Sequence, residues 1–509
     1  TSSERSGRTS PGQTQVKKAL PFPESAEWIN TDRPVTMESL RGRFVLLDFW
    51  TYGCINCIHM IPNLNALADT FSDELVVIGV HSGKFDSERR AENLNQAVQR
   101  LGIRYPVVND PELELWQTYG VPAWPTIVLI NPVGELVGAH AGEWPLESLK
   151  SLLTGLIAET QESESMATEF GNIELGLREQ NRDTLLRFPE GLLLDRAANR
   201  LYVADTGNNR VVVVEPNTGK LVSVLGSGAP GFLDGTAAGA QFRSPRGMAA
   251  MNGAVFIADS GNHAIRRYDR ETQTVTTVVQ GDVEEFGQLR SPWDLATDGQ
   301  ILYVATAGEH QIWTVDPATG AAAEFAGSGS EGMADGPAAR AQMAQPQGLS
   351  LIGDSLYVAD AESSSIRRIF DLRGESTVET IVGQGLFEFG LEDGPAPLAL
   401  FNHPSDVVAI PVEPGPREQP RSPSHVTLYV TDSYNNRIRR IDGGRVSHLD
   451  LGDTTLDEPT GLVADGSQLW VADTNNHRIA QVDPESGEAT PFRIGTGTSS
   501  RKRFDVASV

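Results

Sequence analysis

Two cysteines separated by two residues form the most reactive pair of side chains in this sequence. Residues 48–62 read DFWTYGCINCIHMIP and contain Cys54 and Cys57, the only cysteines of the chain. Two thiols at this spacing can close a small disulfide ring and exchange it with the disulfide of another protein. They could instead bind a metal, but no further cysteine would complete the site. We therefore expect neither a metal nor a cofactor, while an inert, structural pair remains the alternative.

The apolar pattern around the cysteines predicts that a strand gives way to a helix at Cys54. FVLLDFW, from Phe44, is apolar and of strand length, and apolar side chains recur at helical spacing from Ile58 to Leu67. Unpaired backbone N–H groups and the helix dipole favour a thiolate at a helix N-terminus. We therefore predict that Cys54 is the more reactive thiol and is open to solvent, with Cys57 deeper in the helix.

The elements that must position this pair follow in a recognisable order. ELVVIGVH predicts a second buried strand, a polar helix is expected over 87–102, and VPAWPTIVLINPVGELVG predicts two strands joined by a turn at 131–134. The helix LESLKSLLTGLIAE closes the unit. The order βα, βα, ββα is that of a thioredoxin-like α/β domain.

Four features of this domain resemble the thioredoxin family at the family's own spacings. They are the buried acid Asp48, the CINC motif at Cys54, the helix proline Pro62 and the cis-proline loop at Trp124–Thr126. The resemblance implies that Pro125 follows a cis bond and faces the cysteines. It also implies a proton-relay role for Asp48, with a merely structural buried acid as the equal alternative.

Some residues near the cysteines depart from known patterns. Ile55 and Asn56 replace the family's Gly-Pro, and Gly53 replaces its Trp, so the redox potential and the choice of partner do not carry over. Ile58 holds the place of the histidine in the haem-attachment motif, which excludes that motif. We expect His59 to be an exposed helix residue rather than a group that assists proton transfer.

A second pattern recurs six times after a polar linker. Copies such as LYVADTGNNR and LYVTDSYNNRIRR begin at these residues: Leu201, Val255, Leu302, Leu356, Leu428 and Leu469. A Pro-x-Gly or Pro-x-Asp turn precedes each copy, and each unit shows about four short β-branched runs. Six such units predict an all-β, six-bladed propeller. The motif resembles the NHL repeat.

Some of the recurring residues could do chemistry. Arg266, Arg367 and Arg439 could form a basic, RNA-binding face, but each follows an Asp in its own unit, which favours an Asp–Arg pair within the blade. His263, His310 and His477 share one level of the propeller and could ligate a metal. Asn209 and Asn436 fill the same slot in other units, which favours a hydrogen bond in the turn.

A thioredoxin-like domain directly before six NHL repeats resembles the NHL-repeat-containing protein 2 family. The stretches TYGCINCIHMIP and IGVHSGKF strengthen this resemblance, which covers about residues 22–494. We expect the following organisation: a disordered tail over 1–20, the thioredoxin-like domain over 21–158, a linker over 159–186, the propeller over 187–494 and a disordered tail over 495–509.

The net charge of the chain indicates which kind of partner it can bind. The formal net charge of −26 repels phosphate, so we expect a protein partner at the propeller and no nucleic acid. No apolar run is long enough to cross a bilayer, and the first twenty residues lack the apolar centre of a signal peptide. We therefore expect no membrane association and a cytoplasmic location; the oligomeric state is not specified by the sequence.

These observations predict a thiol–disulfide oxidoreductase whose propeller recruits a protein partner. In this interpretation Cys54 attacks a disulfide, Cys57 resolves the mixed disulfide, and Asp48 and Pro125 complete the site. Two alternatives remain. One is a non-catalytic interaction scaffold or redox sensor, and the other is a propeller enzyme with a thioredoxin-like accessory domain.

Overall fold

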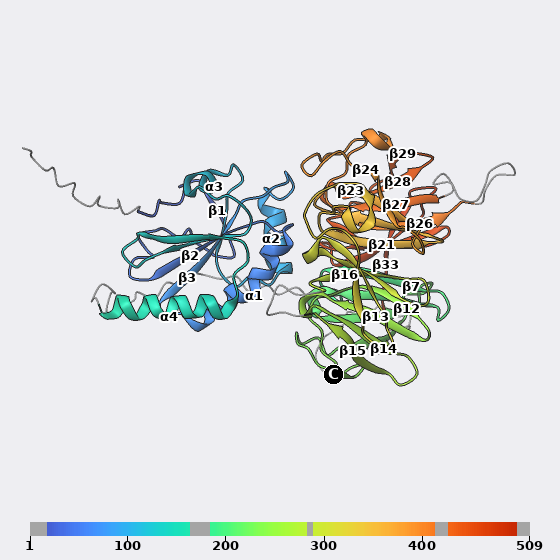
Figure 1. The fold of residues 1–509 in the computed structure, drawn as a ribbon, viewed down its shortest axis with the longest axis horizontal. Helices are drawn as coiled ribbons and strands as arrows, with labels where there is room; N and C mark the ends of the chain where they lie inside the picture. The colour runs from blue at the N-terminus through green and yellow to red at the C-terminus, as the bar shows by residue number, and fades with distance from the viewer. Residues whose placement is uncertain (1–17, 163–183, 282–288, 413–425, 496–509) are drawn as a thin grey trace, which may run out of the picture. The chain divides into compact units, whose positions relative to one another are not determined.

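The chain folds into two compact units, which are described separately. The computed structural model describes residues 18–162, 184–281, 289–412 and 426–495, and the first unit ends at residue 180 of the chain (Figure 1). Most of the predicted tails and linker lies outside the described residues. Within the predicted N-terminal tail, Lys18 forms an antiparallel bridge with Glu135.

The first unit is a six-stranded mixed sheet with helices packed on it. Its strand order is β1-β4-β3-β2-β5-β6, with β2, β3 and β4 parallel to one another and the other neighbours antiparallel. The strands are β1 (Glu27–Ile29), β2 (Phe44–Trp50), β3 (Leu75–His81), β4 (Val107–Asn109), β5 (Thr126–Ile130) and β6 (Leu136–Ala141). Every residue of β2 and β3 is buried, as expected for central strands with both faces covered.

The helices confirm the predicted order and add detail to it. They are α1 (Ile55–Thr70), α2 (Ala91–Arg100), α3 (Glu114–Tyr119) and α4 (Leu146–Glu162). The helix expected over 87–102 is shorter at both ends, and β1, β4 and α3 were not predicted because they are too short to show a period. The strand pair with its turn at Asn131–Gly134 is present as β5 and β6.

The second unit is a ring of six antiparallel sheets, which confirms the six-bladed propeller (Figure 1). The first strands of the blades contact one another around the centre. These inner strands are β7 (Pro189–Asp195), β12 (Pro245–Met251), β16 (Pro292–Thr297), β21 (Pro346–Ile352), β26 (Pro404–Pro411) and β30 (Pro459–Asp465). Each begins at one of the recurring prolines.

The remaining strands follow outward in chain order within each blade. The second strands are β8 (Arg200–Asp205), β13 (Ala254–Asp259), β17 (Leu302–Thr306), β22 (Ser355–Asp360), β27 (Val426–Asp432) and β31 (Gln468–Asp473). The third are β9 (Arg210–Val214), β14 (Ala264–Asp269), β18 (Gln311–Val315), β23 (Ser365–Phe370), β28 (Arg437–Asp442) and β32 (Arg478–Val482). The fourth are β10 (Leu221–Leu225), β15 (Thr274–Gln280), β19 (Ala322–Ala326), β24 (Thr377–Val382), β29 (Arg445–His448) and β33 (Ala489–Phe492).

Three blades carry a fifth strand that the sequence did not predict. The two-residue strands β11 (Gly235–Thr236), β20 (Gly336–Pro337) and β25 (Gly394–Pro395) pair with the outer edges of blades two, four and five. Each belongs to the loop that enters its blade. Two residues at one end of the edge strand are thereby covered, which shortens the surface on which another chain could pair.

The recurring His and Asn residues, with Ser364 at the same position of blade four, join neighbouring blades. Each lies in the left-handed backbone region, and its side chain accepts a hydrogen bond from the N–H that precedes the proline of the next blade. The acceptor–donor pairs are Asn209–Ser244, His263–Ser291, His310–Gln345, Ser364–His403, Asn436–Glu458 and His477–Phe188. The expectation that these histidines make a hydrogen bond is confirmed, but the bond from each Nδ1 joins neighbouring blades and does not lie within the turn.

The pair His477–Phe188 also closes the ring, because it joins the last blade to the first. The His477 Nδ1 to Phe188 N distance is 3.0 Å, and the two rings pack edge to face. Thr474 adds a hydrogen bond to the carbonyl of Pro189, and Gly495 forms a parallel bridge with Lys220, which directly precedes the outer strand β10 of blade one. No strand is exchanged between these blades within the described residues, so side chains and this short bridge fasten the closure.

We predict that His477→Ala destabilises the propeller by about 1–3 kcal/mol, because a backbone N–H loses its buried acceptor. His477→Asn should retain most of the stability, since Asn209 and Asn436 make the same hydrogen bond elsewhere in the ring. Urea unfolding, combined with hydrogen exchange of β7 and β32, measures both variants. Equal destabilisation by Asn and Ala would contradict the proposed role of the acceptor.

Candidate functional site

Both cysteines lie at the start of α1, immediately after the central strand β2. Cys54 is the N-cap residue, and its N–H donates to the carbonyl of Thr51 at 3.3 Å. Cys57 is fully buried, whereas Cys54 keeps 6% of its surface exposed. The predicted order of depth is confirmed. The expectation that Cys54 is open to solvent is wrong, because the residues around the helix start enclose it almost completely.

Asp48 lies beneath the cysteines on β2 and is completely buried. Its Oδ2 accepts a long hydrogen bond of 3.5 Å from the hydroxyl of Tyr105, and its Oδ1 has no partner within the described residues. Burial raises the pKa of Asp48 from 3.8 to about 7, and the Tyr105 hydrogen bond partly offsets this rise. Near neutral pH this carboxyl can therefore both accept and release a proton.

The thiol of Cys57 is electrostatically linked to Asp48. Burial raises the pKa of Cys57 well above its ordinary value, and the contact with the Cys54 thiol and the charge of Asp48 raise it further. The two cysteines and Asp48 thus form one buried group in which a negative charge on any member opposes a charge on the others.

Aromatic side chains that the sequence analysis missed surround this group. Tyr105 and Trp50 both approach Gly79, which pairs with Asp48 across β2 and β3; a side chain at Gly79 would stand 2.9 Å from the Trp50 Nε1. Glycine at this position is therefore required by the close approach of the rings. His81 packs against Trp50, with ring centroids 5.0 Å apart, and burial lowers its pKa to about 3, so it is neutral. A histidine that ends an otherwise apolar strand was the only sequence signal.

A buried carboxylate holds the loop that carries Cys54. Glu88 is fully buried and accepts hydrogen bonds from the backbone N–H groups of Gly53, Lys84 and Phe85 at 3.0, 2.7 and 3.1 Å. Gly53 directly precedes Cys54, so Glu88 fixes the start of α1 against the turn after β3. The IGVHSGKF stretch contains this turn, but the sequence pattern did not identify Glu88, three residues after the end of that stretch, as the acceptor.

The proline loop lies beside the strand that leads to the cysteines. The Trp124–Pro125 bond is cis, which confirms the prediction. Thr126 begins β5 and pairs with Phe49, so Pro125 lies next to the end of β2. The indole of Trp124 donates to the carbonyl of Ser82 at 2.9 Å, which fixes the loop against the turn after β3.

His59 differs from its expectation. Its side chain is largely buried, and Nδ1 lies 3.0 Å from Glu143 Oε1, a residue between β6 and α4. The prediction of an exposed helix histidine is wrong because a helical period does not show which loop will cover a given face. His59 therefore fastens α1 to the α4 end of the domain.

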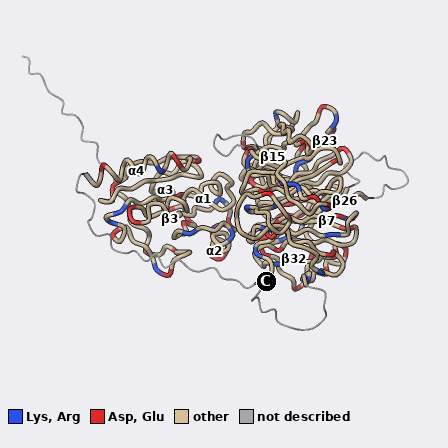
Figure 2. Tube along the Cα trace, turned by 90° about the horizontal axis from the view of Figure 1, so that it is seen from below, with Lys and Arg blue, Asp and Glu red and all other residues tan. Residues whose placement is uncertain are grey.

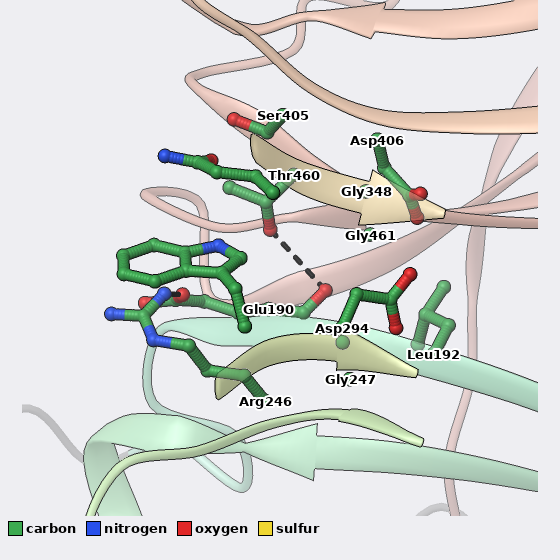
Figure 3. Close-up of a pocket in the computed structure, with 13 residues that line it drawn as sticks. Glu190, Leu192, Arg246, Gly247, Asp294, Gly348, Ser405, Asp406, Thr460 and Gly461 are labelled. Carbon is green, nitrogen blue, oxygen red and sulfur yellow. Dashed lines mark hydrogen bonds and ion pairs between the residues drawn. The ribbon is translucent and has the colours of Figure 1, made fainter. Parts of the chain in front are cut away.

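A second candidate site lies at the centre of the propeller, where the inner strands converge (Figure 3). Its small cavity of about 30 Å³ has room for one or two waters. At one level the guanidinium of Arg246 stacks on Trp293 at 3.6 Å and forms an ion pair with Glu190. Two carboxylates, Asp294 and Asp406, also line the cavity.

These two carboxylates act as connections between blades. Asp294 accepts from the N–H of Leu349 at 2.9 Å, and Asp406 accepts from the N–H of Leu462 at 2.7 Å. Burial raises the pKa of both, that of Asp294 to about 7. Among the described residues, no three His, Cys, Asp or Glu side chains are grouped as a metal site requires. Their hydrogen bonds assign these aspartates to the framework of the ring.

The predicted Asp–Arg pairs are present in the blades. Asp259–Arg266, Asp360–Arg367 and Asp432–Arg439 lie 2.7, 3.4 and 2.6 Å apart, and all six side chains are fully buried. These arginines therefore offer no surface to RNA. Basic and acidic residues are both scattered along the trace of each unit (Figure 2). Of the helices within the described ranges, none combines the length and apolar character of a membrane span.

The fold and the site define a class of protein in which a thioredoxin-like domain precedes an NHL-repeat propeller. The family model described as thioredoxin-like matches residues 42–136, and the NHL repeat model matches 186–214 and 456–482.

Similar proteins place the chain within this class. NHL repeat-containing protein 2 of Bos taurus is 36% identical over 93% of this chain and 71% of the relative. Protein SUPPRESSOR OF QUENCHING 1, chloroplastic, of Arabidopsis thaliana is 32% identical over 92% of this chain and 47% of its own length. The thiol-disulfide oxidoreductase ResA of Halalkalibacterium halodurans is 29% identical over 21% of this chain and 59% of its length. The chain belongs to the NHL repeat-containing protein 2 family.

The raised pKa of Asp48 makes the stability of the first unit depend on pH. The stabilising effect of the neutral carboxyl is complete below pH 3.8 and is lost as the pH rises through about 7. We predict that the free energy of unfolding of Asp48→Asn, relative to that of the wild type, increases by about 3 kcal/mol as the pH rises from about 5 to about 8. Urea unfolding of both proteins across this range, followed by hydrogen exchange of β2 and β3, measures the difference. A difference in unfolding free energy that does not change with pH would show that Asp48 ionises at its ordinary pKa.

Proposed function

We propose that this protein is a thiol–disulfide oxidoreductase whose propeller recruits a protein partner. The observation that carries the proposal is the position of the fully buried Cys57 beside Asp48, an acid whose pKa is about 7. A structural pair of cysteines has no need of a buried proton acceptor. The similarity to a protein named thiol-disulfide oxidoreductase over the same segment supports the proposal.

The exchange proceeds in two steps. The thiolate of Cys54, at the N-terminus of α1, attacks one sulfur of the partner's disulfide, and the other sulfur leaves as a thiolate. Cys57 then loses its proton to Asp48 and attacks the Cys54 sulfur. This forms the Cys54–Cys57 disulfide and releases the second partner thiol. The partner gains two electrons, and this protein loses two.

The loop at Pro125 supplies the backbone on which a partner segment rests. It lies beside the end of β2, and its neighbour Trp124 is fixed by a hydrogen bond to Ser82 and by packing against Trp116, 4.1 Å away between ring centroids. A fixed backbone edge lets an extended segment pair with little ordering of this protein.

A redox sensor or scaffold is the second candidate, and the near-complete burial of both thiols favours it. A sensor needs the cysteines to close a disulfide but needs no turnover of external substrates. Reduction of insulin by dithiothreitol separates the two functions, because only an oxidoreductase accelerates it.

We predict that the wild type accelerates insulin reduction and that Cys54→Ser abolishes the acceleration, since the attacking sulfur is lost. Cys57→Ser should instead accumulate a mixed disulfide on Cys54, detected by mass spectrometry. Iodoacetamide should label Cys54 before Cys57 in the reduced protein.

Asp48→Asn should slow the reduction of insulin by roughly 100-fold near neutral pH, because the proton acceptor for Cys57 is removed. Insulin reduction at the uncatalysed rate by the wild type would reject the proposed activity.

A further inference from the structure

One loop of the propeller exposes three large apolar side chains, whereas the loop that enters blade two exposes two, Phe232 and Leu233. Residues 383–398 connect blade four to blade five, and in this loop Phe387, Leu391 and Leu398 are 76%, 48% and 67% exposed. Exposed apolar side chains this close together in one loop are typical of a surface that a partner covers. We call these three residues the apolar loop surface.

The repeats provide an internal comparison for this loop. Blades two and four are entered by GSGAPGFLDG (226–235) and GSGSEGMADG (327–336), whereas blade five is entered by GQGLFEFGLEDG (383–394), which is two residues longer. The longer segment includes Phe387. Five residues after the shared Asp, Leu398 stands where the other two blades have Gly239 and Arg340. Phe387 therefore belongs to the longer part of the loop, and Leu398 occupies a position where the same fold accepts glycine or arginine. Leu391 corresponds to the apolar residues Phe232 and Met333 of the other two loops.

The three loops are held by the same contacts, so the apolar side chains are not required to hold them. In each loop a buried arginine donates to two loop carbonyls and to the shared Asp; in blade five Arg439 binds Leu400, Glu392 and Asp393. Arg266 and Arg367 make the equivalent contacts. In blade five Gln384 also donates to the carbonyl of Leu398 at 3.2 Å, which joins the two ends of the loop.

The charges of the loop indicate the chemistry of the partner. Glu388 and Glu392 are exposed beside the apolar residues, and neither has an ion-pair partner within the described residues. Asp393 is already engaged by Arg439 and His448. A segment that covers the apolar residues would bring its own charges close to two free carboxylates, which favours lysine and arginine and disfavours acids.

We propose that the apolar loop surface binds a partner protein through an extended segment that combines apolar side chains with lysine or arginine. Because Arg439 fixes the loop before binding, little conformational entropy is lost when the segment docks. The inference rests on the proposed recruiting role of the propeller and specifies the surface that performs it.

The test measures fluorescence anisotropy with the full chain and a labelled synthetic peptide of alternating leucine and lysine, at physiological ionic strength. Phe387→Ser/Leu398→Ser should weaken binding by at least about tenfold, because the apolar contacts are lost. Glu388→Gln/Glu392→Gln should weaken it less and should reduce its salt dependence. Val222→Ser, which removes another exposed apolar side chain on β10, is the matched control and should change nothing.

Peptides in which serine replaces leucine, or glutamate replaces lysine, should bind poorly to the wild type. Unchanged affinity after Phe387→Ser/Leu398→Ser, or equal loss with Val222→Ser, would overturn the inference. Insulin reduction by the same variants is measured in parallel. Loss of peptide binding with intact insulin reduction supports the docking surface. Binding at the loop without any insulin reduction would retain the surface and reject the oxidoreductase.

Discussion

The propeller depends on one buried carboxylate in each blade. In five of the six blades, an Asp at the end of the second strand accepts the backbone N–H two residues before the recurring proline of the same blade, as Asp432 does from Asn402 at 2.7 Å. Its other oxygen pairs with an arginine of the third strand. Burial raises the pKa of Asp259 and Asp432 to about 6 even beside arginine, so desolvation of these carboxylates is costly. The free energy lost by desolvation is offset because the carboxylate accepts hydrogen bonds from a buried backbone N–H and from an arginine, at the point where the chain enters the blade.

Blade three shows that the carboxylate, rather than the aspartate, is the constraint. Thr306 replaces the Asp there, and Glu309, three residues later, accepts the N–H of Arg290 at 2.6 Å. This blade has Gln311 in place of the arginine that begins the third strand of blades one and six. The side chain of Gln311 donates a hydrogen bond to the carbonyl of Gly327 and accepts one from the indole of Trp313. The backbone N–H two residues before the proline of the blade therefore still has a carboxylate acceptor, but this acceptor comes from a residue three positions later in the chain.

The sequence predicted the features that repeat or that follow a local pattern. The two cysteines, the helix start at Cys54, the cis bond before Pro125 and the Asp–Arg pairs could be predicted because each depends on residues close together in a motif. Tyr105 and Glu88 could not, since they reach the cysteines from distant segments that the sheet brings together. The burial of Cys54 and His59 was missed for the same reason, because covering residues come from other loops.

The burial around the cysteines also limits which states of the site are stable. In the proposed exchange, the cysteines are uncharged in both the dithiol and the disulfide, so the burial of Cys57 costs little in either form. The unfavourable state of the proposed exchange is the intermediate in which Cys57 becomes a thiolate. Transfer of its proton to Asp48 makes the carboxyl neutral as the sulfur becomes charged, so the buried group carries one negative charge before and after the transfer. Tyr105 donates its hydrogen bond to the charged carboxylate and not to the thiolate. The Tyr105 hydroxyl therefore stabilises the ionised form of Asp48, which is the form that can accept a proton. In the proposed exchange, the free energy of proton transfer from Cys57 thus depends on Asp48 and Tyr105, which lie outside the CINC motif.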